Sequence, residues 1–335
     1  MNHKIYLQIA AWRDQEIAKT IKSAYSNAEY PDNITFAITW QGYKEDDWML
    51  DEIYSLPGNI KIIKLDASTA PLSLCRIRGE IGSSLITDER YFMQVDSHSM
   101  FQKQWDTSLI SELEIANDFF GKSIITSQAT SFWSWDEPFI ENDLVTVPNQ
   151  ELFDQIGAPV VGEFYVKRPN TQVREVFFNA GCVFAYIDFV KDVPQPRDIL
   201  FQYEQPVMGV RAFTAGYNMI SPARSYVAVL DFYKNPYGNP QHHTRKNDPL
   251  WKEKWGEKEK QNEQLFKDIM SGRIHDPNNG LLSEKTLEEY IDFVGYDPVT
   301  LKVFRDHDPY SPGNFILVPQ EDIEHKKSII RQQMI

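Results

Sequence analysis

The chain has 335 residues and a formal net charge of −14 at pH 7. Its composition, 42% hydrophobic and 13% aromatic, supplies a sizeable core and excludes an intrinsically disordered protein. The negative charge disfavours nucleic acid or an anionic membrane as the main partner, because binding to phosphates requires clustered Lys and Arg. The length corresponds to two domains, or to one large domain with additions.

Location signals in the sequence are few. Cys75 and Cys182 form no CxxC motif, so we expect neither a disulfide scaffold nor a structural zinc site. The chain starts directly with a strand pattern and lacks the apolar segment of a signal peptide. No apolar run approaches the ~18 residues of a transmembrane helix. These features predict a soluble, cytoplasmic protein that has no membrane partner.

The first hundred residues alternate between strand and helix patterns. Strands are predicted at residues 4–11, 34–40, 59–65 and 91–95, and helices at residues 15–27, 44–52 and 74–86. This alternation is typical of an α/β fold in which helices wrap a parallel sheet. No GxGxxG motif follows the first strand, so we do not expect the usual dinucleotide-binding fold.

The second part of the chain is less regular. We predict helices at residues 104–117 and 200–216, strands at 122–127 and 177–186, a last core strand at 226–232, and a partly irregular insert at 145–169. After residue 232 the composition changes to Pro, Gly, Asn and His, and then to mixed charges. We therefore predict an α/β domain of residues 1–245 and a mainly helical C-terminal extension of residues 246–335.

The most informative stretch is the buried strand at residues 91–95 and the polar residues after it, Asp96, Ser97 and His98. Open α/β sheets bind ligands outside the carboxyl ends of their strands. Asp96 and His98 are two positions apart, so in an extended segment both side chains point to one side. A carboxylate and an imidazole suit Mn²⁺ or a similar divalent ion, with diphosphate oxygens completing its shell. The alternative is ordinary turn chemistry at the end of a strand.

Further motifs occur in the order that a known family shows. They are residues 9–14 (IAAWRD), 31–33 (PDN), 78 (R), 91–98 (YFMQVDSH), 105–106 (WD), 179–181 (NAG), 201–205 (FQYEQ), 211–217 (RAFTAGY) and 280–290 (GLLSEKTLEEY). On these residues the chain resembles the GlcNAc-transferase family that includes the cytoplasmic UDP-GlcNAc:hydroxyproline polypeptide α-GlcNAc-transferases. The resemblance covers most of the chain from residue 4 to about residue 295.

The resemblance implies a glycosyltransferase A-type fold, a Rossmann-like sheet flanked by helices. It also implies a metal-dependent glycosyltransferase (a hexosyltransferase) that takes a sugar, expected to be GlcNAc, from a UDP-sugar and retains the anomeric configuration. Asp96 and His98 match the family's motif for binding manganese or Mg²⁺. Asp231 stands where the family usually has a further metal-binding His, and His242 and His243 compete with it for this role.

The resemblance implies the remaining site residues as well. Ala10, Ala11 and Arg13 fall in the first strand-to-helix turn, where the nucleotide would bind. Arg78 would contact the donor through its bidentate guanidinium, together with Asp96 and Ser97.

Glu204 and Gln94 are candidates to stabilise the oxocarbenium-like state. Tyr203-Glu204-Gln205 replaces the family's Gly-Glu-Glu, so one acidic residue is missing. Asp14, the last residue of the motif at residues 9–14, belongs to the donor site or, alternatively, serves only as the N-cap of the following helix.

The acceptor and two other functions stay open. The acceptor hydroxyl belongs to a protein or, in a bacterial or viral enzyme, to a surface glycan. Because Gln205 and Asp231 depart from the family's residues, an alternative function as a catalytically impaired UDP-sugar-binding protein stays open. A glycosyltransferase acting on a modified nucleic-acid base would require a continuous basic strip that includes Arg245, Lys246 and Lys252.

Overall fold

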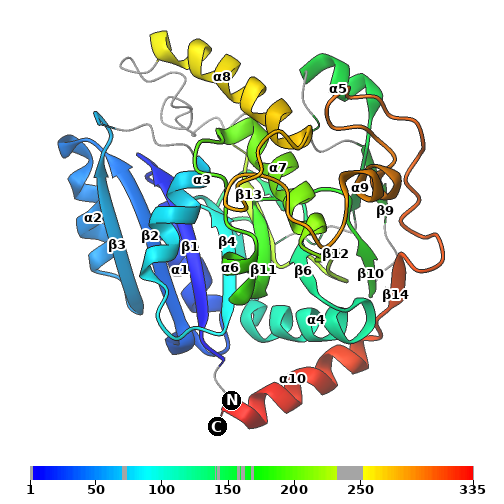
Figure 1. Ribbon diagram of the computed structural model, residues 1–335. Coiled ribbons are helices and arrows are strands. Elements are labelled where there is room, and N and C mark those ends of the chain that lie inside the picture. The colour runs from blue at the N-terminus through cyan, green and yellow to red at the C-terminus, as the bar shows by residue number, and fades with distance from the viewer. Residues whose placement is uncertain are drawn as a thin grey trace.

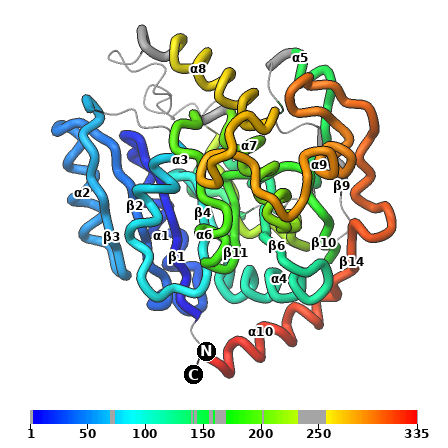
Figure 2. The backbone as a smooth tube through the Cα atoms, in the orientation of Figure 1, coloured from blue at the N-terminus to red at the C-terminus, as the bar shows by residue number. Residues whose placement is uncertain are grey.

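The computed structural model describes residues 3–69, 74–139, 141, 144–156, 159, 163–166, 170–231 and 252–334. Its centre is a nine-stranded sheet with the strand order β14-β10-β12-β6-β11-β4-β1-β2-β3. Figure 1 shows helices covering both faces of this sheet. The tube in Figure 2 shows that the first described residues of the chain lie close to the last helix, α10 (Gln320–Met334).

The amino-terminal part of the sheet is parallel, as the alternation of strands and helices predicts. It consists of β1 (Ile5–Trp12), β2 (Ile34–Gly42), β3 (Asn59–Asp66) and β4 (Tyr91–Asp96). In this register Ala10 lies opposite Asp96 on the neighbouring strand. The carboxyl ends of β1 and β4 therefore meet at one edge of the sheet.

The other half of the sheet is mixed, which differs from the parallel sheet expected from the sequence. It contains β6 (Ser123–Thr126), β10 (Thr171–Arg174), β11 (Cys182–Tyr186), β12 (Asn218–Ser221) and β14 (Phe315–Leu317). β11 runs antiparallel to β4 and β6, and only the pair of β12 and β6 is parallel among these strands. The direction changes because the chain enters β11 from the edge at which β4 ends, and hydrophobic periodicity carries no information about strand direction.

The strand predicted at residues 226–232 exists but does not join the large sheet. β13 (Val227–Leu230) pairs with β5 (Ser99–Phe101) and β7 (Thr130–Phe132) in a sheet of three strands. Its apolar residues pack with Met100 and Phe132 of these partners, so an apolar run alone could not distinguish the two sheets. The insert predicted at residues 145–169 contains a hairpin of β8 (Leu144–Val147) and β9 (Glu163–Val166), and α5 (Gln150–Ile156).

Helices cover the two faces of the large sheet. One face is covered by α1 (Ile17–Asn27), α2 (Asp47–Tyr54) and α4 (Trp105–Phe120), and α10 packs against α4. The other face is covered by α6 (Asp188–Asp192) and α7 (Phe201–Thr214), and α8 (Lys252–Met270) and α9 (Leu287–Val294) pack against α7. The helix predicted at residues 15–27 is confirmed as α1, and its apolar residues Ile17, Ile21 and Ala24, at helical spacing, are all buried.

The segment before β4 was predicted as one helix and instead forms three short pieces. They are α3 (Leu74–Arg76), the π-helix η3 (Ile77–Ile81) and the 3₁₀-helix η4 (Gly82–Leu85). A Cβ on Gly82 would collide with the amide of Gln8, so glycine allows this segment to close against β1. π-Helical turns are frequent at functional sites, and this one carries Arg78.

The C-terminal residues are packed into the same core as the rest of the chain. Tyr290 and Val294 of α9 and Phe266 of α8 belong to the core cluster that also contains residues of α7. Arg211 of α7 is fully buried and donates hydrogen bonds to carbonyl oxygens of Pro194, Pro277 and Gly280. The domain boundary predicted at residues 245/246 lies outside the described residues. Among the described helices, none is long and apolar enough to cross a membrane.

A buried imidazole in this C-terminal region predicts acid sensitivity. His307 is 5% exposed, and burial lowers its pKa to about 4. Below its ordinary pKa of about 6.5, the unfolded chain binds a proton that the folded chain excludes, so stability falls as the pH drops toward 4. The free energy of unfolding of the wild type should decrease between pH 7.5 and pH 5. We expect this decrease to be about 2 kcal/mol smaller in His307→Gln, measured by urea denaturation at both pH values. Identical pH dependence in both proteins would contradict this assignment.

Candidate active site

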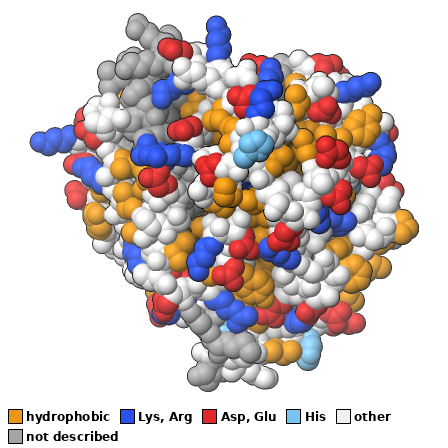
Figure 3. All heavy atoms as spheres, in the orientation of Figure 1, with side chains coloured by type: hydrophobic (Ala, Val, Ile, Leu, Met, Phe, Trp, Pro, Cys, Tyr) orange, Lys and Arg blue, Asp and Glu red, His pale blue; other side chains and the backbone are white. Residues whose placement is uncertain are grey.

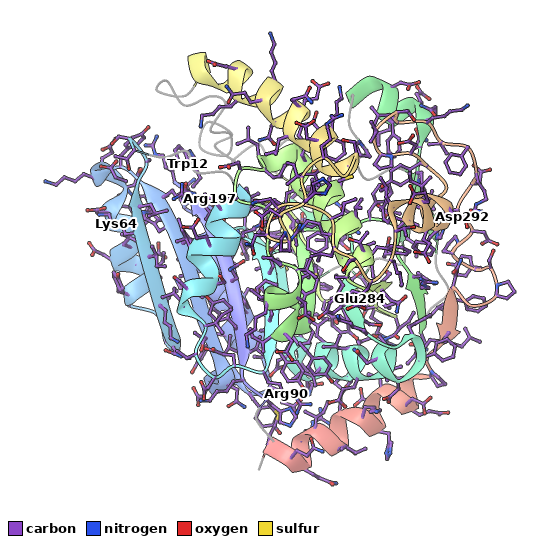
Figure 4. All side chains as sticks on the ribbon, viewed as in Figure 1. Trp12, Lys64, Arg90, Arg197, Glu284 and Asp292 are labelled. Atoms are coloured by element: carbon purple, nitrogen blue, oxygen red, sulfur yellow. The ribbon has the colours of Figure 1, made fainter. Side chains whose placement is uncertain are left out.

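The candidate site lies where β1 and β4 end. Ala10 and Asp96 are paired at these ends. In Figure 4, Trp12 marks the upper end of β1, and Arg90, which precedes β4, lies at the opposite end of the sheet. A Cβ on Gly181, just before β11, would lie 3.2 Å from Oδ2 of Asp96. Glycine at this position therefore keeps space open beside the carboxylate.

Arg78 joins two acidic residues that the sequence places far apart. Its Nη1 donates to both carboxylate oxygens of Glu204, at 2.8 and 2.7 Å, and its Nη2 donates to Oδ1 of Asp96 at 3.0 Å. Arg78 and Glu204 are almost fully buried, whereas the Asp96 side chain is 31% exposed. Burial lowers the pKa of Arg78, but the two carboxylates outweigh burial and raise it. The structure thus unites three of the predicted site residues.

Asp14 holds both other residues of the Asp96-Ser97-His98 turn. Its Oδ2 accepts hydrogen bonds from the Ser97 hydroxyl at 2.5 Å and from Nδ1 of His98 at 2.8 Å. Its Oδ1 accepts from the backbone N–H of Glu16 at 2.9 Å, before α1 begins. Burial lowers the pKa of His98, but the hydrogen bond to Asp14 and the nearby carboxylates raise it above its ordinary value. The Ser97 hydroxyl is therefore directed toward Asp14.

Asp231 follows β13, and the end of β13 lies beside the turn formed by Asp96, Ser97 and His98. The N–H of Leu230 donates to the carbonyl of His98 at 3.0 Å, and the N–H of Asp231 donates to the carbonyl of Phe132 at 2.8 Å. Within the described ranges, no group of three or more His, Cys, Asp and Glu side chains is arranged to hold a metal. His242 and His243 lie outside these ranges. The role of Asp231 as a further metal ligand therefore stays a prediction.

The predicted nucleotide-binding turn has a mixed arrangement. Ala10 faces the same side of the sheet as Asp96, whereas Ala11 belongs to the core on the other side. Arg13 has a positive φ of 49° and donates to both carboxylate oxygens of Asp46, at 2.7 and 3.2 Å. Its guanidinium also lies over the ring of Tyr43, 4.7 Å from the centroid. Donor binding by these residues stays a prediction.

Gln94 supports the backbone beside Asp96. It is fully buried, and its Nε2 donates to the carbonyl of Ala180 at 3.1 Å. Its Oε1 accepts a hydrogen bond from Gln195 at 2.8 Å. Both polar atoms of Gln94 are thus bonded within the protein in this structure, and its proposed catalytic role stays a prediction. Sequence reasoning did not identify Gln195, and it has no local pattern that would have singled it out.

The face of the molecule shown in Figure 3 has no continuous basic strip over its described residues, as binding to nucleic acid would require. Figure 3 shows basic and acidic side chains interspersed over the described part of this face. Arg245 and Lys246 lie outside the described residues, and the Lys252 side chain is likewise not described. The basic strip that this alternative requires stays untested.

Comparison with solved structures assigns the fold to the glycosyltransferase A type. The crystal structure of GalNAc-T7 with UDP, GalNAc and Mn²⁺ matches with a TM-score of 0.53 and 11% identity, over 89% of this chain and 57% of that chain. S. aureus TarS 1-349 with UDP-GlcNAc matches with a TM-score of 0.49 and 9% identity, over 87% and 70% of the two chains. The mannosyltransferase PcManGT from Pyrobaculum calidifontis, with GDP-Man and Mn²⁺, matches with a TM-score of 0.44 and 9% identity, over 70% and 58%.

Sequence comparison defines the family. The model of the glycosyltransferase (GlcNAc) family matches residues 4–73 and 60–300. The chain therefore belongs to the GlcNAc glycosyltransferase family, which agrees with the resemblance seen in its motifs. No curated protein sequence matches it. The chain spans 57% of the length of the GalNAc-T7 chain.

Proposed function

We propose that the protein is a metal-dependent, retaining glycosyltransferase that transfers GlcNAc from UDP-GlcNAc to a hydroxyl group of a protein or glycan. The observation that carries this proposal is the cluster of Asp96, Arg78 and Glu204 at the carboxyl edge of the sheet. Family membership and the UDP, GalNAc and Mn²⁺ named for the GalNAc-T7 structure support it.

Asp96 and His98 fit a divalent ion. Their side chains are 31% and 18% exposed, and they offer a carboxylate oxygen and an imidazole nitrogen, which are ligands that Mn²⁺ accepts. These two residues would hold Mn²⁺ or Mg²⁺, and Asp231 would be the further ligand; its backbone follows Leu230, whose N–H bonds to the His98 carbonyl. A bound ion would offset the charge that develops on the departing diphosphate.

The other residues of the cluster would bind and orient the donor. Arg78 would exchange part of its contact with Asp96 for the donor, because a guanidinium can bind two oxygens at once. Glu204 would keep Arg78 in place, because both of its carboxylate oxygens accept hydrogen bonds from the Arg78 guanidinium.

For the chemical step we propose front-face attack. The acceptor oxygen bonds to the anomeric carbon as the bond to the diphosphate breaks. The departing diphosphate takes the acceptor proton, which requires no enzyme nucleophile and retains the anomeric configuration.

The test is release of UDP from UDP-GlcNAc, UDP-GalNAc and UDP-glucose with Mn²⁺ or with EDTA. We expect slow hydrolysis that needs Mn²⁺, is fastest for UDP-GlcNAc and first yields the α-anomer, followed by NMR. Binding of UDP without turnover of any donor would favour the alternative, a UDP-sugar-binding protein that has lost catalysis. Release of the β-anomer would contradict retention.

A further inference from the structure

We infer that Asp14 is a positioning residue that holds His98 in the tautomer needed to bind the divalent ion. This inference rests on the proposed function, because it concerns the same metal site. It differs from the helix-capping alternative for Asp14, because Glu16 is the N-cap of α1. One Asp14 carboxylate oxygen accepts from the N–H of Glu16, and the other bonds the turn that carries the metal-binding motif.

The geometry of Asp14 determines where the His98 proton lies. A carboxylate can only accept hydrogen bonds, so the contact of 2.8 Å between Oδ2 of Asp14 and Nδ1 of His98 places a hydrogen on Nδ1. In the neutral imidazole the lone pair is then on Nε2, the nitrogen that would bind a metal. Metal-binding histidines commonly donate their second N–H to a carboxylate in this way, which fixes the ring orientation and increases its basicity.

Asp14 is itself held rigidly. It is 2% exposed, and each of its oxygens has a partner within 2.9 Å. It lies two residues after the end of β1, and His98 lies two residues after the end of the neighbouring strand β4. The register of two central strands therefore sets the position of the ring, which favours a precise site over a mobile one.

Replacement by asparagine separates the positioning role from simple packing. An amide keeps the shape but turns one acceptor oxygen into a donor NH₂ group. At the Oδ1 position this group would face the fixed N–H of Glu16, so the NH₂ group is better placed at the Oδ2 position. There it would donate to Nδ1 of His98 and shift the ring hydrogen to Nε2. The histidine would then present an N–H to the ion.

The experiment titrates Mn²⁺ into the wild type and Asp14→Asn, with free Mn²⁺ measured by electron paramagnetic resonance, with and without UDP. We expect Asp14→Asn to bind Mn²⁺ about 10–100-fold more weakly, the loss typical of a removed partner of a metal ligand. Asp106→Asn is the matched control, because Asp106 is 1% exposed and caps backbone N–H groups of Glu29 and Tyr30 instead. It should keep the affinity for Mn²⁺ of the wild type.

A double-mutant cycle with His98→Ala shows whether Asp14 acts through His98. In the His98→Ala background, Asp14→Asn should reduce Mn²⁺ affinity no further. Wild-type affinity in Asp14→Asn, or an equal loss in both backgrounds, would overturn the inference and leave the proposed function intact. If the wild type itself bound no Mn²⁺, the proposed metal dependence would fail together with the inference.

Discussion

Asp96→Asn is expected to lose Mn²⁺-dependent binding of UDP-GlcNAc and to release UDP about 10³-fold more slowly than the wild type. The change removes one negative charge from the candidate metal site and weakens the hydrogen bond of 3.0 Å from Arg78. Ion-mediated stabilisation of a leaving group contributes several kcal/mol, and each 1.4 kcal/mol corresponds to about tenfold in rate. Calorimetric titration with Mn²⁺ and with EDTA measures binding, and steady-state assays measure turnover.

Asp88→Asn is the control for this variant. Asp88 precedes β4 at the other end of the sheet, and its exposed carboxylate pairs with Lys4 at 2.6 Å. Binding and turnover should not change in this control. If Asp96→Asn bound UDP-GlcNAc as the wild type does, with the same response to EDTA, the donor site would have to lie elsewhere.

Arg78→Met is expected to lower the free energy of unfolding by about 3–5 kcal/mol, in addition to its effect on donor binding. Arg78 is 4% exposed and neutralises Glu204, which is 1% exposed. Removing the guanidinium leaves a buried carboxylate without its cation, and this cost exceeds the loss of the hydrogen bonds. Chemical denaturation in the absence of donor and metal measures the change.

A second substitution tests the cause of this destabilisation. Glu204→Gln removes the stranded charge, so Arg78→Met/Glu204→Gln should be more stable than Arg78→Met alone. Arg305→Met is the matched control, because Arg305 pairs with Asp292 on the surface at 3.4 Å, and such pairs contribute at most about 1 kcal/mol. A double variant no more stable than the single one would show that packing, not charge, accounts for the loss.

The sequence was sufficient for the parts of the fold that depend on local pattern. The four parallel strands β1 to β4 and the helices α1 and α2 between the first three were predicted from periodicity, and they are confirmed. Strand direction after β4 and the membership of β13 in a second sheet were not predictable, because they depend on where long connections return. The π-helix at Arg78 depends on the close approach of Gly82 to β1, which a helical pattern does not reveal.

The candidate site shows the same division. Asp96, Ser97 and His98 are adjacent, and their position after a buried strand was enough to single them out. Arg78 and Glu204 are 126 positions apart, and nothing local to either residue predicts their ion pair. Asp14 and His98 are 84 positions apart, and their contact follows from the pairing of β1 with β4. The place of Asp14 at the end of β1, the edge where a ligand was expected, was the available signal.

The most direct test of the central claim is a crystal structure with UDP and Mn²⁺, with diffraction data collected at the manganese absorption edge. We predict an anomalous peak for manganese next to a carboxylate oxygen of Asp96 and Nε2 of His98, with the diphosphate of UDP beside it. A peak remote from both residues, or UDP bound at another edge of the sheet, would contradict the account.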